Sequence, residues 1–366
     1  MYIYLDENIN NIDFSLYPQY VDSISQLISS ACCGCNLLDA KRSTFKFLIT
    51  SGCFSENQIK NLEEIMRHNY EYNDLFKHIP YKIVVSSTAS TITKNGNSWE
   101  IPLSSIEYGY LQAVELLAED LTDGKLLIHA ADHYQKINGY RSLAYKIIPR
   151  NGGGANIADN LLSSLESGKD FTIVFCDSDR FSPDANLGEV TQKCKDLTEK
   201  NVGLSIFFST LGREIENDIP LTFITESHLE DPNVLRRIEK LEELNKKLDI
   251  PFMKYMDLKE GLKSEWFYKF VDSSENFKFW NQIISVLPKL DPVSFPEEIS
   301  ENKPEIILPM IASKMASNTL DWLDNKKKNH PKSVHTSITN DTRAKSWLIH
   351  GENIFWLGCA MKKIRL

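Results

Sequence analysis

The most informative hydrophobic pattern in the chain is an unbroken apolar run, Phe171-Thr-Ile-Val-Phe-Cys176, followed at once by Asp177-Ser-Asp179. Such a run of β-branched and aromatic residues is typical of a buried strand in a parallel sheet. In open α/β sheets, ligands bind just beyond the carboxyl ends of the strands. Because residues i and i+2 of a strand share a face, we expect Asp177 and Asp179 to point the same way, about 6–7 Å apart at the backbone. The alternative is a strand that simply ends in a polar turn.

The segments around this run alternate between strand-like and helical patterns. Strands are expected at 113–118, 145–149 and 203–209, and helices at 125–134, 157–165, 187–197 and from 213 onward. Alternation with short connections is typical of a parallel sheet with right-handed crossovers. Residues 109–225 are therefore predicted to form a compact α/β domain, in which helices cover both faces of a parallel four-stranded sheet.

The regions on either side of this domain have different patterns. Residues 1–108 are predicted to form an α+β module for regulation, assembly or substrate shaping, and residues 226–366 a mainly helical region with a basic tail. In the first region we expect a strand at 1–5, helices at 19–31 and 56–68 (the second with a Ser55–Gln58 capping box), and a hairpin centred on Asn95-Gly96 between strands at 81–86 and 98–103. In the second we expect helices at 230–248 and 306–323, a linker around Pro288, Pro292 and Pro296, and a return to a core at 346–357, which is rich in Trp and Ile.

Composition adds bounds to this picture. The chain has 366 residues, 42% of them hydrophobic and 25% charged, which is enough to bury a proper core. No run approaches the roughly 18 uncharged residues of a membrane span, and no basic-then-apolar signal segment opens the chain. We therefore expect a soluble cytoplasmic protein. The seven cysteines do not suggest a disulfide framework, and reduced thiols are the default. The alternative is a zinc site made by Cys32, Cys33 and Cys35 with Cys53 or His68.

The net charge of −9 argues against generic adhesion to nucleic acid, but the charge is unevenly distributed. Residues 326–366 carry nine Lys or Arg against two acids, and the rest of the chain is strongly acidic. Such asymmetry marks either a nucleic-acid or partner contact or a solvated basic face. The candidate nucleic-acid contacts are Lys326, Lys327, Lys328, Lys332, Arg343 and Lys345, with His330 and His335 nearby.

Three predicted strand ends carry the candidate chemistry. The first ends at Glu119, the second runs into Gly152-Gly153-Gly154, and the third ends at Asp177 and Asp179. The carboxyl ends of parallel strands meet at one edge of a sheet. Two Asp carboxylates suit Mg²⁺, with Mn²⁺ as an alternative, and a nearby Glu can ligate a metal or act as general acid/base. The glycines, with Asn156, would let backbone N–H groups approach a phosphate at a helix N-terminus.

These residues also carry a family resemblance. The segments Leu116-Leu-Ala-Glu119-Asp-Leu-Thr-Asp123, Gly152-Gly-Gly-Ala-Asn156 and Ile173-Val-Phe-Cys-Asp177-Ser-Asp179 together resemble a TOPRIM domain, the catalytic fold of topoisomerases, bacterial primases and OLD-family nucleases. The likeness covers about residues 112–220. The glycine-rich turn and Arg213-Glu-Ile-Glu-Asn217 resemble the OLD-like and stand-alone TOPRIM proteins of bacterial antiphage systems.

The resemblance implies a role for each matched residue. Glu119 would be the general acid/base, Asp177 and Asp179 would bind Mg²⁺ (Glu119 also serving as a ligand), and Asp123 would be an accessory acid. It further implies cleavage of DNA or of an RNA such as tRNA, in defence against phage, held in check by a partner. No P-loop is present, so an ATPase partner would be another chain. A homo-oligomer is compatible with this organisation.

One position departs from the family. TOPRIM proteins usually have Gly directly after the catalytic Glu, where this chain has Asp120. A side chain there would crowd the backbone or add a fourth acid. Further accessory candidates are Asp120, Lys125, Arg180, Glu214 and Glu216. For Glu214 and Glu216 the alternative is a favourable position in the first turn of a helix.

Two other functions remain open on the sequence. A degenerate TOPRIM module would bind nucleic acid or a partner without cleaving. A phosphatase of the haloacid dehalogenase type would use Asp177 as nucleophile and Asp179 as acid/base; that class expects the Asp-x-Asp on the first strand and a downstream Lys and acidic pair. His129 and His133 have a metal-like i, i+4 spacing, but buried helix histidines are the expected reading.

Overall fold

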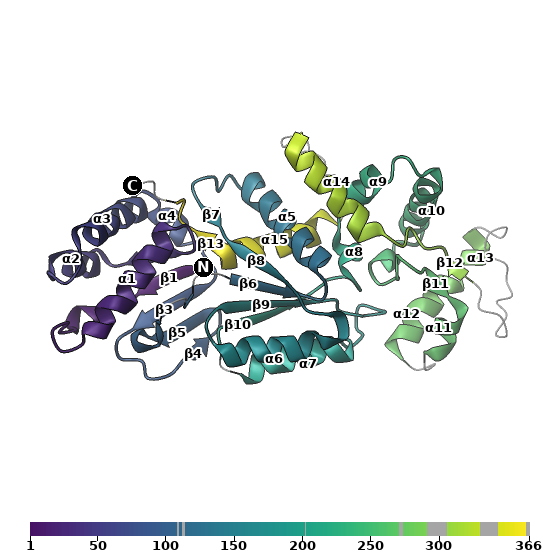
Figure 1. Cartoon of the computed structure of the whole chain (residues 1–366). Coiled ribbons are helices and arrows are strands. Elements are labelled where there is room, and N and C mark those ends of the chain that lie inside the picture. Colours follow the sequence, from purple (N-terminus) through teal and green to yellow (C-terminus); the bar gives the residue numbers. More distant parts are fainter. Residues whose placement is uncertain are drawn as a thin grey trace. The chain divides into compact units, whose positions relative to one another are not determined.

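The computed structural model describes residues 1–107, 110–111, 114–201, 203–270, 274–290, 306–329 and 343–363, without the side chains of 289–290 and 327–329 (Figure 1). The chain packs into two compact units. Unit 1 comprises Met1–Val174, Cys194–Phe207 and His350–Leu366, and unit 2 comprises Phe175–Lys193 and Phe208–Ile349. This is a division by packing. The boundaries expected after residues 108 and 225 divide the chain by fold pattern instead.

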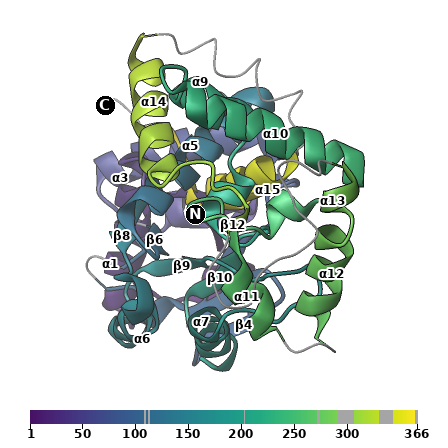
Figure 2. The same ribbon diagram turned by 90° about the vertical axis from the view of Figure 1, so that its right-hand side faces the viewer.

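The predicted parallel four-stranded sheet is present. Its order is β10-β9-β6-β8, and all four strands are parallel (Figure 2). The strands are β6 (Val114–Ala118), β8 (Ile147–Asn151), β9 (Phe171–Cys176) and β10 (Ser205–Ser209). Every residue of β6 and β9 is buried, as the continuous apolar runs predict for central strands.

The connections explain where this sheet can hold a site. Helix α5 (Leu121–Ile137) joins β6 to β8, α6 (Ile157–Ser167) joins β8 to β9, and α7 (Glu189–Lys200) joins β9 to β10. Helices α5 and α6 lie on opposite faces of the sheet (Figures 1 and 2). From β6 the chain first adds β8 on one side and then β9 and β10 on the other. The strand order therefore reverses between β6 and β9, which is where doubly wound sheets bind ligands.

The N-terminal module is α/β rather than the predicted α+β. Its sheet has the order β2-β1-β3-β5-β4, in which only β4 is antiparallel to its neighbour. The strands are β1 (Tyr2–Leu5), β2 (Leu37–Ala40), β3 (Lys82–Ser86), β4 (Thr93–Asn95) and β5 (Ser98–Pro102). Helices lie between β1 and β2 and between β2 and β3, and connections of this length allow parallel pairing. These helices are α1 (Pro18–Cys32), α2 (Arg42–Thr50), α3 (Glu56–Glu71) and α4 (Asn73–Phe76).

The predicted hairpin at Asn95-Gly96 forms, but its first arm is β4 and not the expected strand at 81–86. Gly96 has φ +59° and joins β4 to β5, as an Asn-Gly turn requires. Strand β3, which was expected to be the first arm, instead pairs with β5 in parallel. The register aligns Ile83 with Trp99 and Val85 with Ile101, so that these buried side chains share one face. The capping box of Ser55 and Gln58 at the start of α3 is confirmed.

The chain after β10 is mainly helical where the structure describes it. Its helices are α8 (Ile215–Asp218), α9 (Leu221–Ser227), α10 (Pro232–Leu248), α11 (Ser264–Lys269), α12 (Glu275–Ile284), α13 (Leu287–Leu290), α14 (Met315–Asn329) and α15 (Ala344–Gly358). The predicted helix at 306–323 is wrong at its start. Residues Ile306–Leu308 form β12, paired with β11 (Leu262–Lys263), because Pro309 disfavours helical backbone at the preceding residue.

Short elements complete the described chain. They are β7 (Ala144–Tyr145), β13 (Cys359–Ala360), and the 3₁₀ helices at Glu7–Asn11, Leu103–Ser105, Gly154–Asn156 and Phe252–Lys254. Strands β7 and β13 pair antiparallel, which ties the end of the chain into unit 1. Within the described residues, no helix combines the length and apolar character needed to cross a bilayer.

The close approach of α15 to α5 within unit 1 gives a stability prediction. A Cβ added at Gly351 would lie 2.3 Å from the carbonyl oxygen of Ala130, a backbone atom of α5. Gly351→Ala would gain up to about 1 kcal/mol of helix propensity, but the clash costs about 1–3 kcal/mol or more, so we expect a net loss of stability. Thermal unfolding followed by circular dichroism measures it. The control is Gly203→Ala, whose Cβ would meet only Leu165 Cδ2 at 3.4 Å. Equal midpoints for the two variants would contradict this packing.

Candidate functional site

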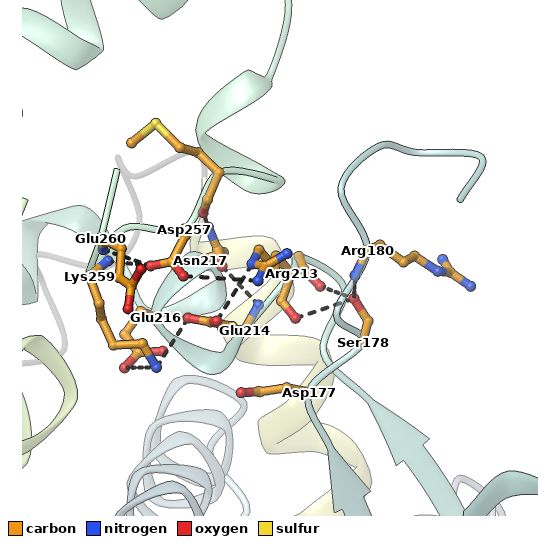
Figure 3. A network of polar contacts seen from close by, with 12 residues as sticks. Asp177, Ser178, Arg180, Arg213, Glu214, Glu216, Asn217, Asp257, Lys259 and Glu260 are labelled. Atoms are coloured by element: carbon orange, nitrogen blue, oxygen red, sulfur yellow. Dashed lines mark hydrogen bonds and ion pairs between the residues drawn. The ribbon is translucent and has the colours of Figure 1, made fainter. Parts of the chain in front are cut away.

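The loop that follows β9 is held by a buried serine. Ser178 has no exposed surface; its N–H donates to Thr210 Oγ1 at 2.8 Å, and its Oγ donates to the carbonyl of Gly212 at 2.5 Å. Thr210 Oγ1 in turn donates to the same Gly212 carbonyl at 2.9 Å. These bonds join the loop after β9 to the loop after β10 (Figure 3). The strand ends at Cys176, so both aspartates lie in this loop and not on the strand.

Asp177 and Asp179 flank Ser178 and are positioned by backbone groups. Oδ1 of Asp177 accepts a hydrogen bond from the N–H of Ile215 at 2.9 Å. Asp179 has φ +55°, an uncommon conformation for a residue other than glycine, and its N–H donates to the carbonyl of Arg213 at 3.0 Å. Asp177 is half-buried and Asp179 is exposed, whereas Ser178 points inward. The expectation that Asp177 and Asp179 share one face of a strand does not apply, because both follow the last strand residue and Asp179 has a left-handed backbone.

A glycine makes room for Asp179. A Cβ at Gly188 would lie 2.5 Å from Asp179 Oδ2, and the N–H of Gly188 donates to the carbonyl of Ser178. This close approach desolvates the carboxylate. Desolvation raises the pKa of Asp179, while the cationic groups of Arg213 and Lys259 act in the opposite direction.

The segment from Arg213 to Asp218 brings further charged residues to the same network (Figure 3). Glu214 is the N-cap of α8, and Glu216 lies in the first turn of that helix. Lys259 Nζ lies 3.1 Å from Glu214 Oε2 and 3.3 Å from Glu216 Oε1. The Arg213 guanidinium lies 3.5 Å from Glu214 and 3.9 Å from Asp257, and 3.9 Å from the ring centroid of Phe181. Arg213, Glu214, Glu216 and Asp257 are all buried. All of these residues belong to unit 2.

The loop geometry is set by two further side chains. Oδ1 of Asn217 accepts from the N–H of Glu214 at 2.8 Å, and its Nδ2 donates to the carbonyls of Met253 and Met256. The Asp218 carboxylate accepts from the N–H groups of Leu211 and Gly212 at 2.6 and 2.9 Å. Because Asn217 and Asp218 are buried and paired, they hold the preceding acids, Glu214 and Glu216, in place.

The cluster contains more acids than bases. Arg213 and Lys259 act on Asp179, Lys259 pairs with Glu214 and Glu216, and Arg213 lies 3.9 Å from Asp257. Burial raises the pKa of Glu214, and Asp257 and Glu216 add to this shift, although Lys259 opposes it. Desolvation would lower the pKa of Lys259, but the carboxylates of Glu216 and Glu214 outweigh it and hold that pKa above its ordinary value. The arrangement therefore favours an additional positive charge.

We call five of these residues the acidic cluster: Asp177, Asp179, Glu214, Glu216 and Asp257. Their carboxylate oxygens are the type of ligand that suits a hard divalent cation. Oε2 of Glu216 is buried and receives no hydrogen bond from the described residues, although Lys259 contacts the other oxygen of the same carboxylate. Carboxylate oxygens are the ligands that Mg²⁺ prefers. No three His, Cys, Asp or Glu side chains of the described residues converge as a complete metal-binding group. The cysteines of the alternative zinc site do not form such a group either. Cys32, Cys33, Cys35 and Cys53 are free thiols.

Glu119 and its neighbours belong to unit 1 and show a different organisation. Glu119 directly follows β6 and is half-buried, and its carbonyl accepts from the N–H of Gly154 at 2.9 Å. Asp120 is the N-cap of α5: its Oδ1 accepts from the N–H groups of Thr122 and Asp123 at 2.5 and 3.3 Å. Asp123 completes the capping box by accepting from the N–H of Asp120 at 3.2 Å. The helix begins four residues earlier than expected because of this cap.

The glycine-rich turn has a packing role in the structure. The N–H of Gly152 donates to the carbonyl of Ala118, that of Gly153 to Asn151 Oδ1, and that of Gly154 to the carbonyl of Glu119. A Cβ at Gly152 would lie 2.5 Å from the Ala118 carbonyl oxygen, so the turn needs glycine there to approach β6. Since these N–H groups already have partners, phosphate binding by Gly152, Gly153, Gly154 and Asn156 stays a prediction that would require these bonds to open.

The other sequence candidates are dispersed. Lys125 is exposed on α5, and the N–H of Arg180 donates to Ser178 Oγ at 3.3 Å. His129 and His133 are buried on α5, with ring centroids 6.5 Å apart. Among the basic residues, Lys326 lies 3.9 Å from Glu226, Arg343 is directed at the carbonyl of Glu216 at 3.5 Å, and Lys345 is exposed. The side chains of Lys327 and Lys328, and residues Lys332, His330 and His335, lie outside the described part of the chain.

Sequence reasoning missed four residues of this network: Ser178, Thr210, Asp257 and Lys259. Ser178 is the residue between the two aspartates, and Thr210 directly follows β10, so a search for small hydroxyl residues at strand ends could have found both. Asp257 and Lys259 lie about 80 residues after the Asp-x-Asp in a segment without a motif. Only the fold brings them to the site.

Comparison of this chain with protein-family models, with curated proteins and with solved structures finds no match in any of the three. The site therefore rests on its own geometry.

The raised pKa of Glu214 gives a prediction about stability and pH. Its folded pKa is raised above the ordinary value of 4.5, so the stability that this carboxyl contributes is present below that value and is lost as the pH rises through the folded pKa. Glu214→Gln should therefore unfold at a higher temperature than the wild type at pH 7 in EDTA, and the difference should shrink as the pH falls toward 4.5. Thermal unfolding between pH 4.5 and 8 measures this.

The matched control is Glu260→Gln. The pKa of Glu260 is lowered by its hydrogen bond to Lys263, which gives the opposite sign, so no gain is expected at pH 7. If Glu214→Gln instead unfolded at a lower temperature at pH 7, the Glu214 carboxylate would be a net stabilising partner of Lys259, and the acidic cluster would not carry the electrostatic cost inferred here.

Proposed function

We propose that this protein is a metal-dependent nuclease of the TOPRIM type, which hydrolyses phosphodiester bonds in DNA or RNA. One observation carries the proposal: the segments after the neighbouring parallel strands β9 and β10 bring Asp177, Asp179, Glu214 and Glu216 within the electrostatic influence of one lysine, Lys259. Glu214 also caps α8 and Glu216 lies in its first turn, but Oε2 of Glu216 is buried without a hydrogen-bond donor among the described residues, which favours a cation there.

The acidic residues would hold the metal. Oδ1 of Asp177 accepts from the N–H of Ile215, which orients that carboxylate, and Oε2 of Glu216 is a buried oxygen that accepts no hydrogen bond from the described residues. Mg²⁺, or Mn²⁺ in its place, would neutralise the phosphodiester and lower the pKa of a water ligand. The chain's part is to orient the carboxylates, to which the Ser178 and Thr210 hydrogen bonds would contribute by fixing the loop that carries Asp177 and Asp179.

In this proposal, Glu119 would act as the general acid/base. Its support is topological: β6, which it follows, neighbours β9 in the sheet at the point where the strand order reverses. Glu119 would take a proton from the attacking water or give one to the leaving oxygen. Asp120 and Asp123 already cap α5, so they would contribute negative potential rather than ligands. Lys259 would neutralise the cluster and approach a phosphate oxygen when a cation displaces it from the carboxylates.

The biological setting is proposed on the TOPRIM resemblance alone. A bacterial cytoplasmic effector in antiphage defence, cutting DNA or a tRNA and controlled by an ATPase encoded nearby, is the context in which such a domain is expected. The exposed Lys345 and the basic residues of the tail would then help to bind nucleic acid.

Nuclease assays test the proposal. Asp177→Asn and Glu119→Gln should each lower Mg²⁺-dependent cleavage of plasmid, single-stranded DNA or total tRNA by at least about 100-fold, since one removes a metal ligand and the other the proton-transfer group. The control is Asp184→Asn, which neutralises an exposed acid of the same loop. Cleavage measured on gels with Mg²⁺, Mn²⁺ or EDTA gives the comparison. Should the wild type and both variants act alike on every substrate, catalysis is excluded and a degenerate binding module remains.

A second candidate is favoured by one observation. Lys259 with Glu214 and Glu216 provides the downstream lysine and acidic pair that a haloacid dehalogenase-type phosphatase would use beside Asp177 and Asp179. In that reading Oδ2 of Asp177 is the nucleophile. However, the Asp-x-Asp follows the third strand of this sheet and not the first.

Turnover of p-nitrophenyl phosphate separates the two functions. A phosphatase should lose at least about 100-fold of its turnover in Asp177→Asn and in Lys259→Ala but keep it in Glu119→Gln. A nuclease should show the opposite dependence on Glu119. The Asp184→Asn variant again serves as the control. Absence of turnover by the wild type, in Mg²⁺ and in Mn²⁺, would rule out the phosphatase.

A further inference from the structure

The N-terminal module contains a cavity of about 430 Å³, well apart in sequence from the acidic cluster and wholly within unit 1. This volume lies in the range of small-molecule sites. The cavity is at the carboxyl end of β2, whose last residues Asp39 and Ala40 line it, and helices α2 and α3 supply its other walls. In parallel sheets this is the edge at which ligands bind.

The inner wall of the cavity presents a fixed carboxylate. Asp39 Oδ2 accepts from the hydroxyl of Tyr2 at 2.7 Å, and Oδ1 accepts from its neighbour's N–H in Ala40 at 2.8 Å and from Asn69 Nδ2 at 2.9 Å. Three donors therefore hold the carboxylate in one orientation. An acid at the end of the second strand of a β-α-β unit is well placed to accept hydrogen bonds from ribose hydroxyls.

The rim has the opposite charge. Arg42 and Arg67 both line the cavity and are exposed, and Arg42 has no ion-pair partner among the described residues. Arg67 is paired with Glu64, which is on the same helix and does not line the cavity. Guanidinium groups bind phosphate in a fixed, bidentate geometry. The cavity lining therefore combines groups that bind anions with a carboxylate that accepts hydrogen bonds.

Aromatic groups also line the cavity. Phe45 is buried in the wall, and the Tyr70 side chain lines the cavity although it is 83% exposed. A tyrosine so exposed has almost no packing role in the chain itself, and its flat ring can stack on a base.

From this arrangement we propose that the N-terminal module binds a nucleoside phosphate, with the ribose hydroxyls on Asp39, the phosphate on Arg42 and Arg67, and the base against Tyr70. The lining suits a ligand with an anionic group, a planar body and hydrogen-bond donors, and nucleoside phosphates combine all three. The site is independent of the proposed nuclease function, because no residue is shared.

Isothermal titration calorimetry of the full chain tests the proposal. ATP, GTP, CTP, UTP, adenosine and inorganic phosphate are titrated in EDTA, so that no divalent cation links a nucleotide to the acidic cluster. At least one triphosphate should bind in the micromolar range, and adenosine and phosphate at least about tenfold more weakly. The double variant Arg42→Ala/Arg67→Ala should weaken binding at least about tenfold.

Two more variants keep the test decisive. Tyr70→Ala should weaken binding about fivefold or more without affecting the fold, since the side chain is exposed. Arg141→Ala removes the same charge from an exposed position outside the cavity and should leave affinity within about twofold. The proposal is overturned if no triphosphate binds at millimolar concentration, if inorganic phosphate binds as tightly as a nucleotide, or if the cavity variants bind like Arg141→Ala.

Discussion

The candidate site depends on the hydrogen bonds that the buried Ser178 makes. Its N–H and hydroxyl are satisfied by Thr210 and the Gly212 carbonyl, and a buried polar group left without such partners would cost about 1–3 kcal/mol. This requirement fixes the loop after β9 against the loop after β10. It follows that Asp177 and Asp179, on either side of Ser178, are oriented by an inward-facing residue that carries no charge itself. The left-handed backbone of Asp179 is maintained by the same constraint.

Electrostatics shapes the rest of the network. Burial of Glu214 and Glu216 is tolerated because Lys259 lies between them and Arg213 stands over Phe181, yet the acids still outnumber the bases. Buried ion pairs seldom stabilise a fold in net terms, because removing the charges from water costs as much as their attraction returns. A cluster with this excess of acid therefore carries an electrostatic cost, and the raised pKa of Glu214 expresses that cost.

The glycine-rich turn and Asp120 show how local physics changes the meaning of a motif. Three glycine N–H groups that could have faced a phosphate instead donate within the chain, and Gly152 permits a backbone approach that a Cβ would prevent. Asp120, in a position where glycine is usual in TOPRIM proteins, caps α5 with Asp123 as its reciprocal partner. Both features are explained by packing and capping of unit 1. In unit 2, Glu214 is likewise the N-cap of α8 in a capping box with Asn217, and Glu216 lies in the first turn of that helix, as the alternative reading expected.

Much of the fold could be predicted from the sequence, because strands and helices are set by local periodicity and end signals. The buried run at 171–176, the strand–helix alternation, the capping box at Ser55 and the Asp-x-Asp at a strand end are all local patterns, and each is present in the structure. Strand pairing was harder to predict from the sequence. Strands β3 and β5 looked like hairpin arms but pair in parallel. Their pairing depends on which faces are buried by distant segments. The same reason explains the site. The sequence determined that two aspartates follow a buried strand, but only the tertiary structure decided that Ser178 and Thr210 orient them and that Lys259, 80 residues away, joins their acidic neighbours, since such contacts follow from packing and leave no periodic trace in the chain.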